Sequence, residues 1–437
     1  MSRFKGGMLL ARKLACGFAV FLAVAVCCGF FANDATAGGG NERIAKVENE
    51  IPRYSDPNPF AVLLFSFNNM LNPQTTRDLP QTSLDSLMTE YKIPGACVGV
   101  IEDFDVDWIK GYGKIHAERD IEVTPDTYFE AGSTTKILTA ALVMKLAEQD
   151  KLDLDANVND YLTSWKIPDS PLLSGKYVTP RLLLSHLSGL NEGNNFGAEE
   201  GKVPTVVDVL EGRSPATNGP AEIENEPGTR WQYSNFGFIV LQLMVEDHLG
   251  RPYADLMQEY IFDPLDMRRA TFAYADKKQI RDEAIVPHDP SGTPHERAMN
   301  PTIKAHGDLQ VSPRDLATFT IELMKAYVGK PNRLFSRETA REMLKVSRRI
   351  KPEEFHGLVN MSYGHGAFLV GEDDSFVFFH PGSNNPGTSS MLIANPEAGK
   401  GAVVMTNGAQ GLLLAVQMVT SVSLAYDWPC DASLGSE

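Results

Sequence analysis

A serine and a lysine three residues apart are the chemistry-bearing pair that says most about this chain of 437 residues. Ser133 and Lys136 stand at the start of an apolar run that predicts a buried helix. Side chains three residues apart lie on the same face of a helix, so the lysine amine can reach the serine hydroxyl. A lysine in a dry pocket can lose its proton and act as a base, while the N–H groups of a helix start favour an oxyanion. The pair therefore predicts nucleophilic catalysis without a histidine.

The spacing by itself is weak evidence, because it recurs at Ser2 and Lys5 in a segment with no catalytic context. The alternative for Ser133 is that it belongs to a Ser/Thr cluster that caps an ordinary buried helix. Other motifs in the chain have to decide between the two interpretations.

Residues 1–37 have the organisation of a secretory signal peptide. Basic residues end at Lys13, an apolar stretch follows over 14–31, and the small-x-small pattern at 35–37 precedes three glycines. We therefore expect an exported protein, periplasmic or secreted. The alternative is an uncleaved membrane anchor, since the apolar stretch is long for a signal. Lipidation at Cys27 is disfavoured because Val26 precedes it where a small residue is needed.

The bulk composition excludes several classes of protein. The chain carries 40 basic and 56 acidic residues, a net charge of −16, and no Lys/Arg cluster beyond the N-terminal region, so no nucleic-acid partner is expected. Its histidines lack metal-ligand spacing, and it has neither a Gly-x-Ser-x-Gly elbow nor a phosphate-binding glycine loop. We expect no metal and no cofactor, and a small-molecule or peptide substrate as partner. The oligomeric state is not readable from the sequence.

Two cysteines remain after the signal segment, Cys97 and Cys430. An exported chain could pair them, but a single possible bridge is not a disulfide framework. Cys97 lies in an apolar run, which favours a buried and inert thiol.

The pattern of apolar residues predicts an α+β fold (an α/β sandwich). Strands are expected at 97–101 and 108–112, as a hairpin, and again at 367–370, 375–379, 389–394 and 402–406, with a last helix at 412–426. The stretch 150–345 is mostly helical in pattern. This arrangement predicts one antiparallel sheet flanked by helices, assembled from distant segments, plus an inserted helical region, with the cleft between them. The expected boundaries are an irregular leader at 38–75, the folded domain at 76–428 and a tail at 429–437.

Further motifs occur in a fixed order. Tyr233-Ser234-Asn235 precedes a predicted helix, His380-Pro381-Gly382 ends the predicted strand 375–379, and residues 184–190 close a helix. With Ser133 and Lys136 these motifs resemble the serine β-lactamase / penicillin-binding-protein-like family over about residues 80–425, nearest to its class C β-lactamase and esterase branch with a His-x-Gly third motif. The resemblance implies a β-lactamase/transpeptidase-like fold and an acyl-enzyme serine hydrolase.

The resemblance also implies roles for single residues. Ser133 would be the nucleophile, Lys136 the base that activates it, and Tyr233 the general base and acid, with a pKa lowered by the lysine charge. Asn235 would orient the substrate carbonyl side and Lys136.

The third motif implies the substrate side of the site. The backbone N–H groups of Ser133 and Ser383 would form the oxyanion hole, and Gly382 would let the substrate backbone approach the strand edge. His380 would be a substrate-binding residue, the alternative being a structural role at the strand end. His186 is expected to be structural.

The chain departs from the lactamase form of this motif. His380 stands in place of a lysine and Pro381 in place of a hydroxyl residue, so recognition of a substrate carboxylate should be weak. This favours a small ester or a D-amino-acid-containing peptide as substrate. The alternatives are a true β-lactamase or D,D-carboxypeptidase, and a non-enzymatic binding or sensor protein that keeps the fold.

Overall fold

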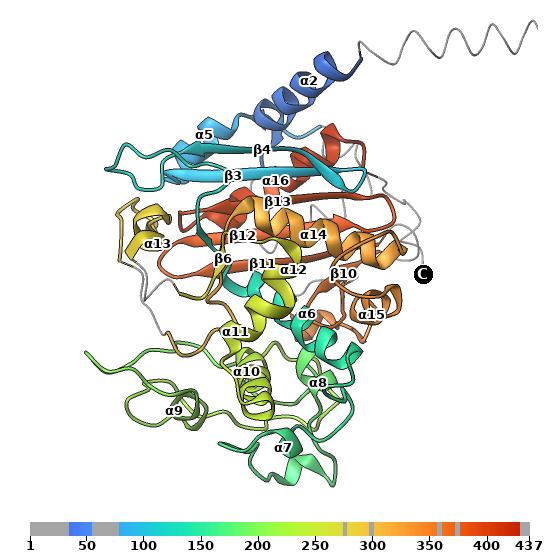
Figure 1. The fold of residues 1–437 in the computed structure, drawn as a ribbon. Coiled ribbons are helices and arrows are strands. Elements are labelled where there is room, and N and C mark those ends of the chain that lie inside the picture. The colour runs from blue at the N-terminus through green and yellow to red at the C-terminus, as the bar shows by residue number, and fades with distance from the viewer. Residues whose placement is uncertain are drawn as a thin grey trace, which may run out of the picture.

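The computed structural model describes residues 35–54, 78–273, 278–296, 301–355, 361–371 and 376–428. Its centre is an eight-stranded antiparallel sheet with strand order β4-β3-β13-β12-β11-β10-β9-β8, and helices cover both of its faces (Figure 1). The strands are β3 (Gly95–Glu102), β4 (Asp105–Gly113), β8 (Arg348–Arg349), β9 (Met361–Tyr363), β10 (Phe368–Val370), β11 (Val377–Asn384), β12 (Thr388–Asn395) and β13 (Lys400–Thr406).

The central strands are buried on both faces because their apolar residues alternate between two cores. On β13, Val403 and Met405 pack with helices α6 (Thr135–Glu148) and α14 (Pro313–Val328), whereas Val404 packs with α16 (Gly411–Ala425). The sequence prediction of one antiparallel sheet assembled from both ends of the chain and flanked by helices is confirmed.

The inserted region follows α6 and precedes α14 in the sequence. Its part from α7 (Val158–Tyr161) to α10 (Asn235–Leu249) lies below the sheet in Figure 1, whereas α13 (Lys278–Glu283) lies beside the sheet. A small sheet of β5 (Phe129–Glu130), β6 (Ala270–Thr271) and β7 (Gln310–Val311) joins the two ends of this region. The helices here and beyond it are α7 (Val158–Tyr161), α8 (Pro180–Leu184), α9 (Val206–Glu211), α10 (Asn235–Leu249), α11 (Tyr253–Met257), α12 (Asp263–Leu265), α13 (Lys278–Glu283) and α15 (Arg337–Met343).

The segment before the domain is more ordered than the sequence suggested. Helix α2 (Ala35–Asn49) is followed by β1 (Ile51–Pro52), which pairs with β2 (Gln81–Thr82) ahead of α5 (Leu84–Glu90). The prediction of an irregular leader is therefore wrong for residues 38–49. The reason is that α16 offers an apolar face, which Val47 and Ile51 cover, each fully buried. Ser421 on α16 also donates to the carbonyl of Val47 at 3.1 Å.

Other predictions about the chain ends are only partly covered by the structure. Residues 1–34 of the signal segment, residues 55–77 of the leader and the tail 429–437, which includes Cys430, lie outside the described residues. Cys97 is fully buried on β3 with a free thiol. Within the described ranges, no helix has both the length and the apolar character to cross a membrane.

Candidate active site

Ser133 lies in a single 3-10 turn, η1 (Gly132–Thr134), that runs directly into α6. Helix α6 is buried on nearly every side, which fixes this turn at the junction of the sheet and the helical region. Gly132 has a φ of +51°, and a Cβ there would lie 2.8 Å from the backbone nitrogen of Ser383. Only glycine fits this close approach of η1 to β11 without strain.

Lys136 is fully buried in the first turn of α6, and its amine lies beside the Ser133 hydroxyl. Its Nζ lies 3.1 Å from Ser133 Oγ and 2.6 Å from the carbonyl oxygen of His306. Burial lowers the pKa of this amine well below its ordinary value, although the carboxylate of Glu192 acts in the opposite direction. A neutral amine donates one N–H to the His306 carbonyl and can turn its lone pair toward the serine hydroxyl.

Tyr233 reaches the same point from the loop that precedes α10. The N-cap of this helix is Ser234, whose Oγ accepts from the N–H of Gly237 at 3.0 Å. The Lys136 Nζ lies 5.0 Å from the centre of the Tyr233 ring. Burial raises the pKa of the phenol, while its hydrogen bond with Ser133 lowers it by less.

The expectation that Lys136 lowers the pKa of Tyr233 is therefore wrong. A buried amine that has lost its proton supplies no positive charge, so desolvation of the phenolate dominates. Ser133, Lys136 and Tyr233 nevertheless come together as the motif order predicted, with both proton carriers neutral beside the hydroxyl.

Asn235 does not contact Lys136 through any hydrogen bond in the structure. Its Nδ2 donates to the carbonyl of Gly193 at 2.8 Å, and its backbone N–H donates to the carbonyl of Glu192 at 2.6 Å. The side chain thus ties the neighbouring loop to the start of α10. The carbonyl of His306 orients Lys136 instead.

The third motif lies inside β11 rather than at its end. Strand β11 pairs with β12 as far as Asn384, whereas β10 covers it only up to Phe379. Beyond that point one edge of β11 is free of a neighbouring strand, which allows a proline at position 381. The predicted strand end at residue 379 is therefore too early.

The turn η1 docks on this free part of β11. Thr134 Oγ1 donates to the carbonyl of His380 at 3.0 Å, and Ser390 Oγ donates to the carbonyl of Ala131 at 2.5 Å. A Cβ at Gly382 would lie 2.0 Å from the Ala131 carbonyl oxygen. Gly382 is therefore required by the protein's own backbone, and the expectation that it also lets the substrate approach the strand edge stays a prediction.

The side chain of His380 is fully buried, so it offers no exposed atom to a substrate. Its Nδ1 lies 2.8 Å from the carbonyl oxygen of Pro381, and its Nε2 lies 3.4 Å from the hydroxyl of Tyr363. Burial lowers the pKa of His380 to about 3, so the ring is neutral at physiological pH. The predicted substrate-binding role is therefore wrong for this side chain, while the predicted lack of a fixed positive charge agrees with its neutral state.

Ser383 is exposed, and its backbone nitrogen lies next to η1, as the close approach to Gly132 shows. This brings the backbones of Ser383 and Ser133 to the same place, which the expected oxyanion hole requires. The buried Glu130 holds the end of β11 in position: its Oε2 accepts from Asn384 Nδ2 at 3.2 Å and from Thr388 Oγ1 at 2.8 Å.

Sequence reasoning missed three contributors to this site. Glu130 and Thr134 flank Ser133 in the sequence, so their polar character in an apolar stretch was a usable signal. The His306 carbonyl was not predictable, because any residue type supplies a carbonyl and 170 positions separate it from Lys136. In the described part of the chain, no group of three or more His, Cys, Asp or Glu side chains could hold a metal ion.

The fold and this constellation are those of serine-dependent hydrolases of the beta-lactamase type. The beta-lactamase family model matches residues 81–424, and the chain belongs to that family.

A curated relative agrees with this assignment, and two solved structures of lower identity share the fold. Penicillin-binding protein 4 of Amycolatopsis lactamdurans is 26% identical over 342 residues, which are 75% of this chain and 84% of that protein. The solved octameric penicillin-binding protein homologue from Pyrococcus abyssi aligns with a TM-score of 0.65 and 24% identity, over 80% of this chain and 77% of that one. The D-stereospecific amidohydrolase from Streptomyces sp. aligns with a TM-score of 0.60 and 21% identity, over 83% and 97%.

Proposed function

We propose that this protein is an exported serine hydrolase that forms an acyl-enzyme on Ser133 and cleaves an ester or amide bond. The observation that carries the proposal is the fully buried Lys136, whose Nζ lies 3.1 Å from Ser133 Oγ and whose pKa is well below its ordinary value. A neutral amine at hydrogen-bond distance from a hydroxyl is a general base ready to act.

In the acylation step, Ser133 Oγ attacks the substrate carbonyl carbon while Lys136 takes the hydroxyl proton. The negative charge that develops on the carbonyl oxygen is stabilised by the backbone N–H groups of Ser133 and Ser383. The scissile bond then breaks as Tyr233 gives its proton to the departing alcohol or amine, and Lys136 returns its extra proton to Tyr233. The raised pKa of Tyr233 suits this role, because a neutral phenol is present to donate.

Deacylation uses the same groups in reverse. A water molecule attacks the acyl carbon and gives a proton to Tyr233 Oη, while the proton that the phenol carried moves to the neutral Lys136. Lys136 then gives a proton to Ser133 Oγ as the acid product leaves. No step of this cycle calls for a metal or cofactor.

For the substrate, we favour a small ester or a D-amino-acid-containing peptide over a β-lactam. His380 is buried and neutral, and Pro381 has no N–H or hydroxyl to donate, so the third motif offers little to a substrate carboxylate. The similar fold of the D-stereospecific amidohydrolase from Streptomyces sp. is compatible with a substrate of this class.

A second candidate is a true β-lactamase or D,D-carboxypeptidase, which the similarity to a penicillin-binding protein favours. Fast turnover of nitrocefin would select it. A protein that no serine-directed probe labels would instead support a non-enzymatic binding role.

The test is the intact mass of the purified protein, quenched rapidly after mixing with p-nitrophenyl butyrate, beside its Ser133→Ala variant. We expect a butyryl adduct on the wild type only, together with nitrophenol release. Absence of both from the wild type, with esters, D-amino-acid peptides and a fluorophosphonate probe, would refute the hydrolase proposal. The mass of the protein recovered from its host also tests whether residues 1–37 are removed or remain as an anchor.

A further inference from the structure

We propose that His186 is a positioning residue that holds Tyr233 in its reactive orientation. This inference rests on the role proposed above for Tyr233. His186 follows the C-cap of α8 and is 1% exposed, so it contacts the site from inside the protein.

One histidine holds the backbone on both sides of Tyr233. The Nδ1 of His186 accepts the N–H of Ser234 at 3.1 Å, and the backbone carbonyl of His186 accepts the N–H of Gln232 at 3.0 Å. Two hydrogen bonds from one residue to positions 232 and 234 restrict the backbone of the residue between them, and with it the direction of the phenol.

The imidazole ring also packs directly on the phenol. Its centre lies 4.4 Å from the ring centre of Tyr233 and 4.8 Å from that of Tyr363. Because Nδ1 accepts an N–H, the ring proton is on Nε2 and the imidazole is neutral. Burial also lowers the pKa of His186 well below its ordinary value, consistent with this state.

The backbone of His186 supports a specific role. Its φ of +57° is uncommon for a residue other than glycine and persists only where the surroundings impose it. An ordinary core residue would avoid this backbone conformation. His186 adopts it, and in this conformation its Nδ1 accepts the N–H of Ser234.

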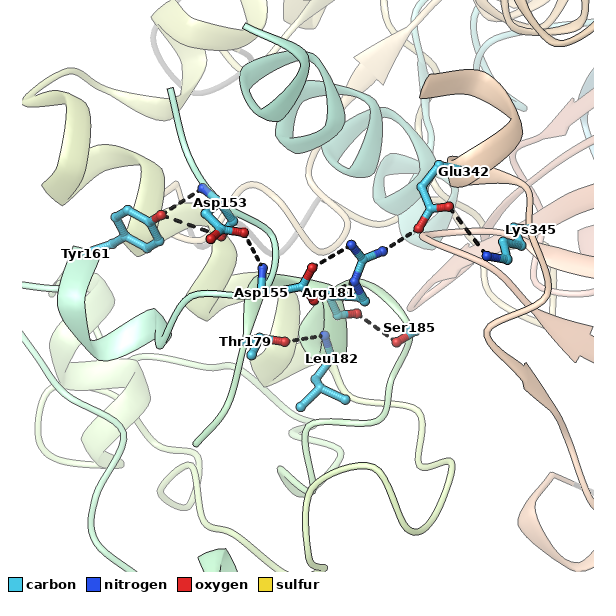
Figure 2. Close-up of polar contacts among 9 residues, drawn as sticks. All are labelled: Asp153, Asp155, Tyr161, Thr179, Arg181, Leu182, Ser185, Glu342 and Lys345. Atoms are coloured by element: carbon cyan, nitrogen blue, oxygen red, sulfur yellow. Dashed lines mark hydrogen bonds and ion pairs between the residues drawn. The ribbon is translucent and has the colours of Figure 1, made fainter. Parts of the chain in front are cut away.

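Helix α8, which presents His186, is fixed independently of Tyr233 (Figure 2). Arg181 on α8 binds both carboxylate oxygens of Asp155, at 2.7 and 2.9 Å, and reaches Glu342 on α15 at 2.5 Å. Ser185 donates to the carbonyl of Arg181 at 2.7 Å. His186 thus transmits the position of a clamped helix to the loop that carries Tyr233.

Two variants separate the acceptor from the ring. In His186→Asn the amide oxygen can accept from Ser234 as Nδ1 does, and asparagine tolerates a positive φ, but the ring is lost. In His186→Phe the ring and its packing remain, but the acceptor is lost. Because a φ of +57° by itself favours asparagine over phenylalanine, the order of stability does not separate the two roles. A positioning role predicts that His186→Phe loses acylation rate at a melting temperature close to that of His186→Asn, whereas a residue that only fills the core would lose rate and melting temperature together.

The readout is the acylation rate constant and KM with p-nitrophenyl butyrate, with melting temperature as the measure of folding. We expect the rate constant of His186→Phe to fall about 10- to 100-fold with KM changed by less than about threefold, since a displaced catalytic group costs rate rather than binding. We expect His186→Asn to stay within about fivefold of the wild type, which is rescue by an acceptor alone.

The inference is overturned if His186→Phe acylates like the wild type, or if folded His186→Asn loses more than about tenfold. If the wild type itself reacts with no ester, peptide or fluorophosphonate probe, the hydrolase proposal fails. The inference is then judged from crystal structures of the two variants. A Tyr233 hydroxyl that moves away from Ser133 only in His186→Phe supports the positioning role, and an unmoved hydroxyl in both variants overturns it.

Discussion

Replacing Gly382 by alanine tests whether the reactive serine depends on the contact between η1 and β11. A Cβ at this position would lie 2.0 Å from the Ala131 carbonyl oxygen and 2.6 Å from Ser390 Oγ. Real Cβ atoms essentially never come closer than 3.0 Å, so η1 and β11 must separate by the difference, 1.0 Å. Both neighbours are held by backbone or by a short buried side chain, so neither can move aside alone.

The separation has two consequences. It stretches the Thr134–His380 and Ser390–Ala131 hydrogen bonds, 3.0 and 2.5 Å long, beyond bonding distance. At about 0.5–1.5 kcal/mol each, their loss lowers the free energy of unfolding by about 1–3 kcal/mol. It also moves the backbone nitrogen of Ser383 away from Ser133, and a misplacement of this size costs about 100-fold in rate.

The assay is the rate of Ser133 acylation by p-nitrophenyl butyrate, with urea unfolding of the same samples. Gly219→Ala is the matched control, because a Cβ there has nothing within 4 Å and the φ of Gly219 is not in the left-handed region. We expect the Gly382→Ala rate to fall about 100-fold and the control to stay near the wild type. A folded Gly382→Ala variant that acylates within about threefold of the wild type would refute the dependence on this contact.

Three further predictions concern ionisable side chains. The acylation rate should rise with pH as Lys136 loses its proton and should level off below the ordinary lysine pKa of about 10.4. A wild-type rate that still rises at about pH 10.4 would contradict a lowered pKa of Lys136. Lys136→Met should abolish the reaction. His306 and His380, with pKa values of about 3, and His365, with a pKa of about 4, are neutral when folded but gain protons below about 6.5 when unfolded. The contribution of each histidine to the free energy of unfolding is present above that pH and falls by about 1.4 kcal/mol per pH unit as the pH decreases toward its folded pKa. His365→Asn should therefore make the free energy of unfolding in urea less steeply dependent on pH by that amount. An unchanged slope in the variant would count against the prediction. Arg181→Met should lower the free energy of unfolding by about 1–2 kcal/mol after allowance for solvent screening. The control is Arg268→Met, which should cost less because the Arg268 side chain is 83% exposed. Equal losses in the two variants would show that the ion pairs of Arg181 stabilise the fold no more than an exposed pair does.

The sequence predicted the sheet well because its strands are short apolar runs bounded by turn residues. The hairpin at 97–112 and the strands near 389–394 and 402–406 appear close to their expected positions, as β3, β4, β12 and β13. Boundaries were less predictable where pairing partners decide them. Strand β11 continues to Asn384 because β12 pairs with it that far, a long-range fact that a local pattern does not contain. Helix α2 was missed for the same reason, since its partner α16 lies at the other end of the chain.

Residue types and their order also predicted which groups meet in the site. Ser133, Lys136 and Tyr233 carry chemistry that few other side chains can supply, so their motifs were visible without coordinates. The protonation state and the hydrogen-bond partners of each group could not be predicted from the sequence. The raised pKa of Tyr233, the buried and neutral His380 and the turn of Asn235 toward Gly193 all depend on which atoms surround them.

The sequence by itself therefore determined the family, the antiparallel sheet and the juxtaposition of Ser133 and Lys136, because these follow from local patterns and side-chain chemistry. The tertiary structure alone decided the protonation states, the carbonyl of His306 as the partner of Lys136, and the close contact that makes Gly382 necessary. These properties arise from desolvation and from backbone atoms brought together across long stretches of chain, and neither is encoded in the type of any single residue.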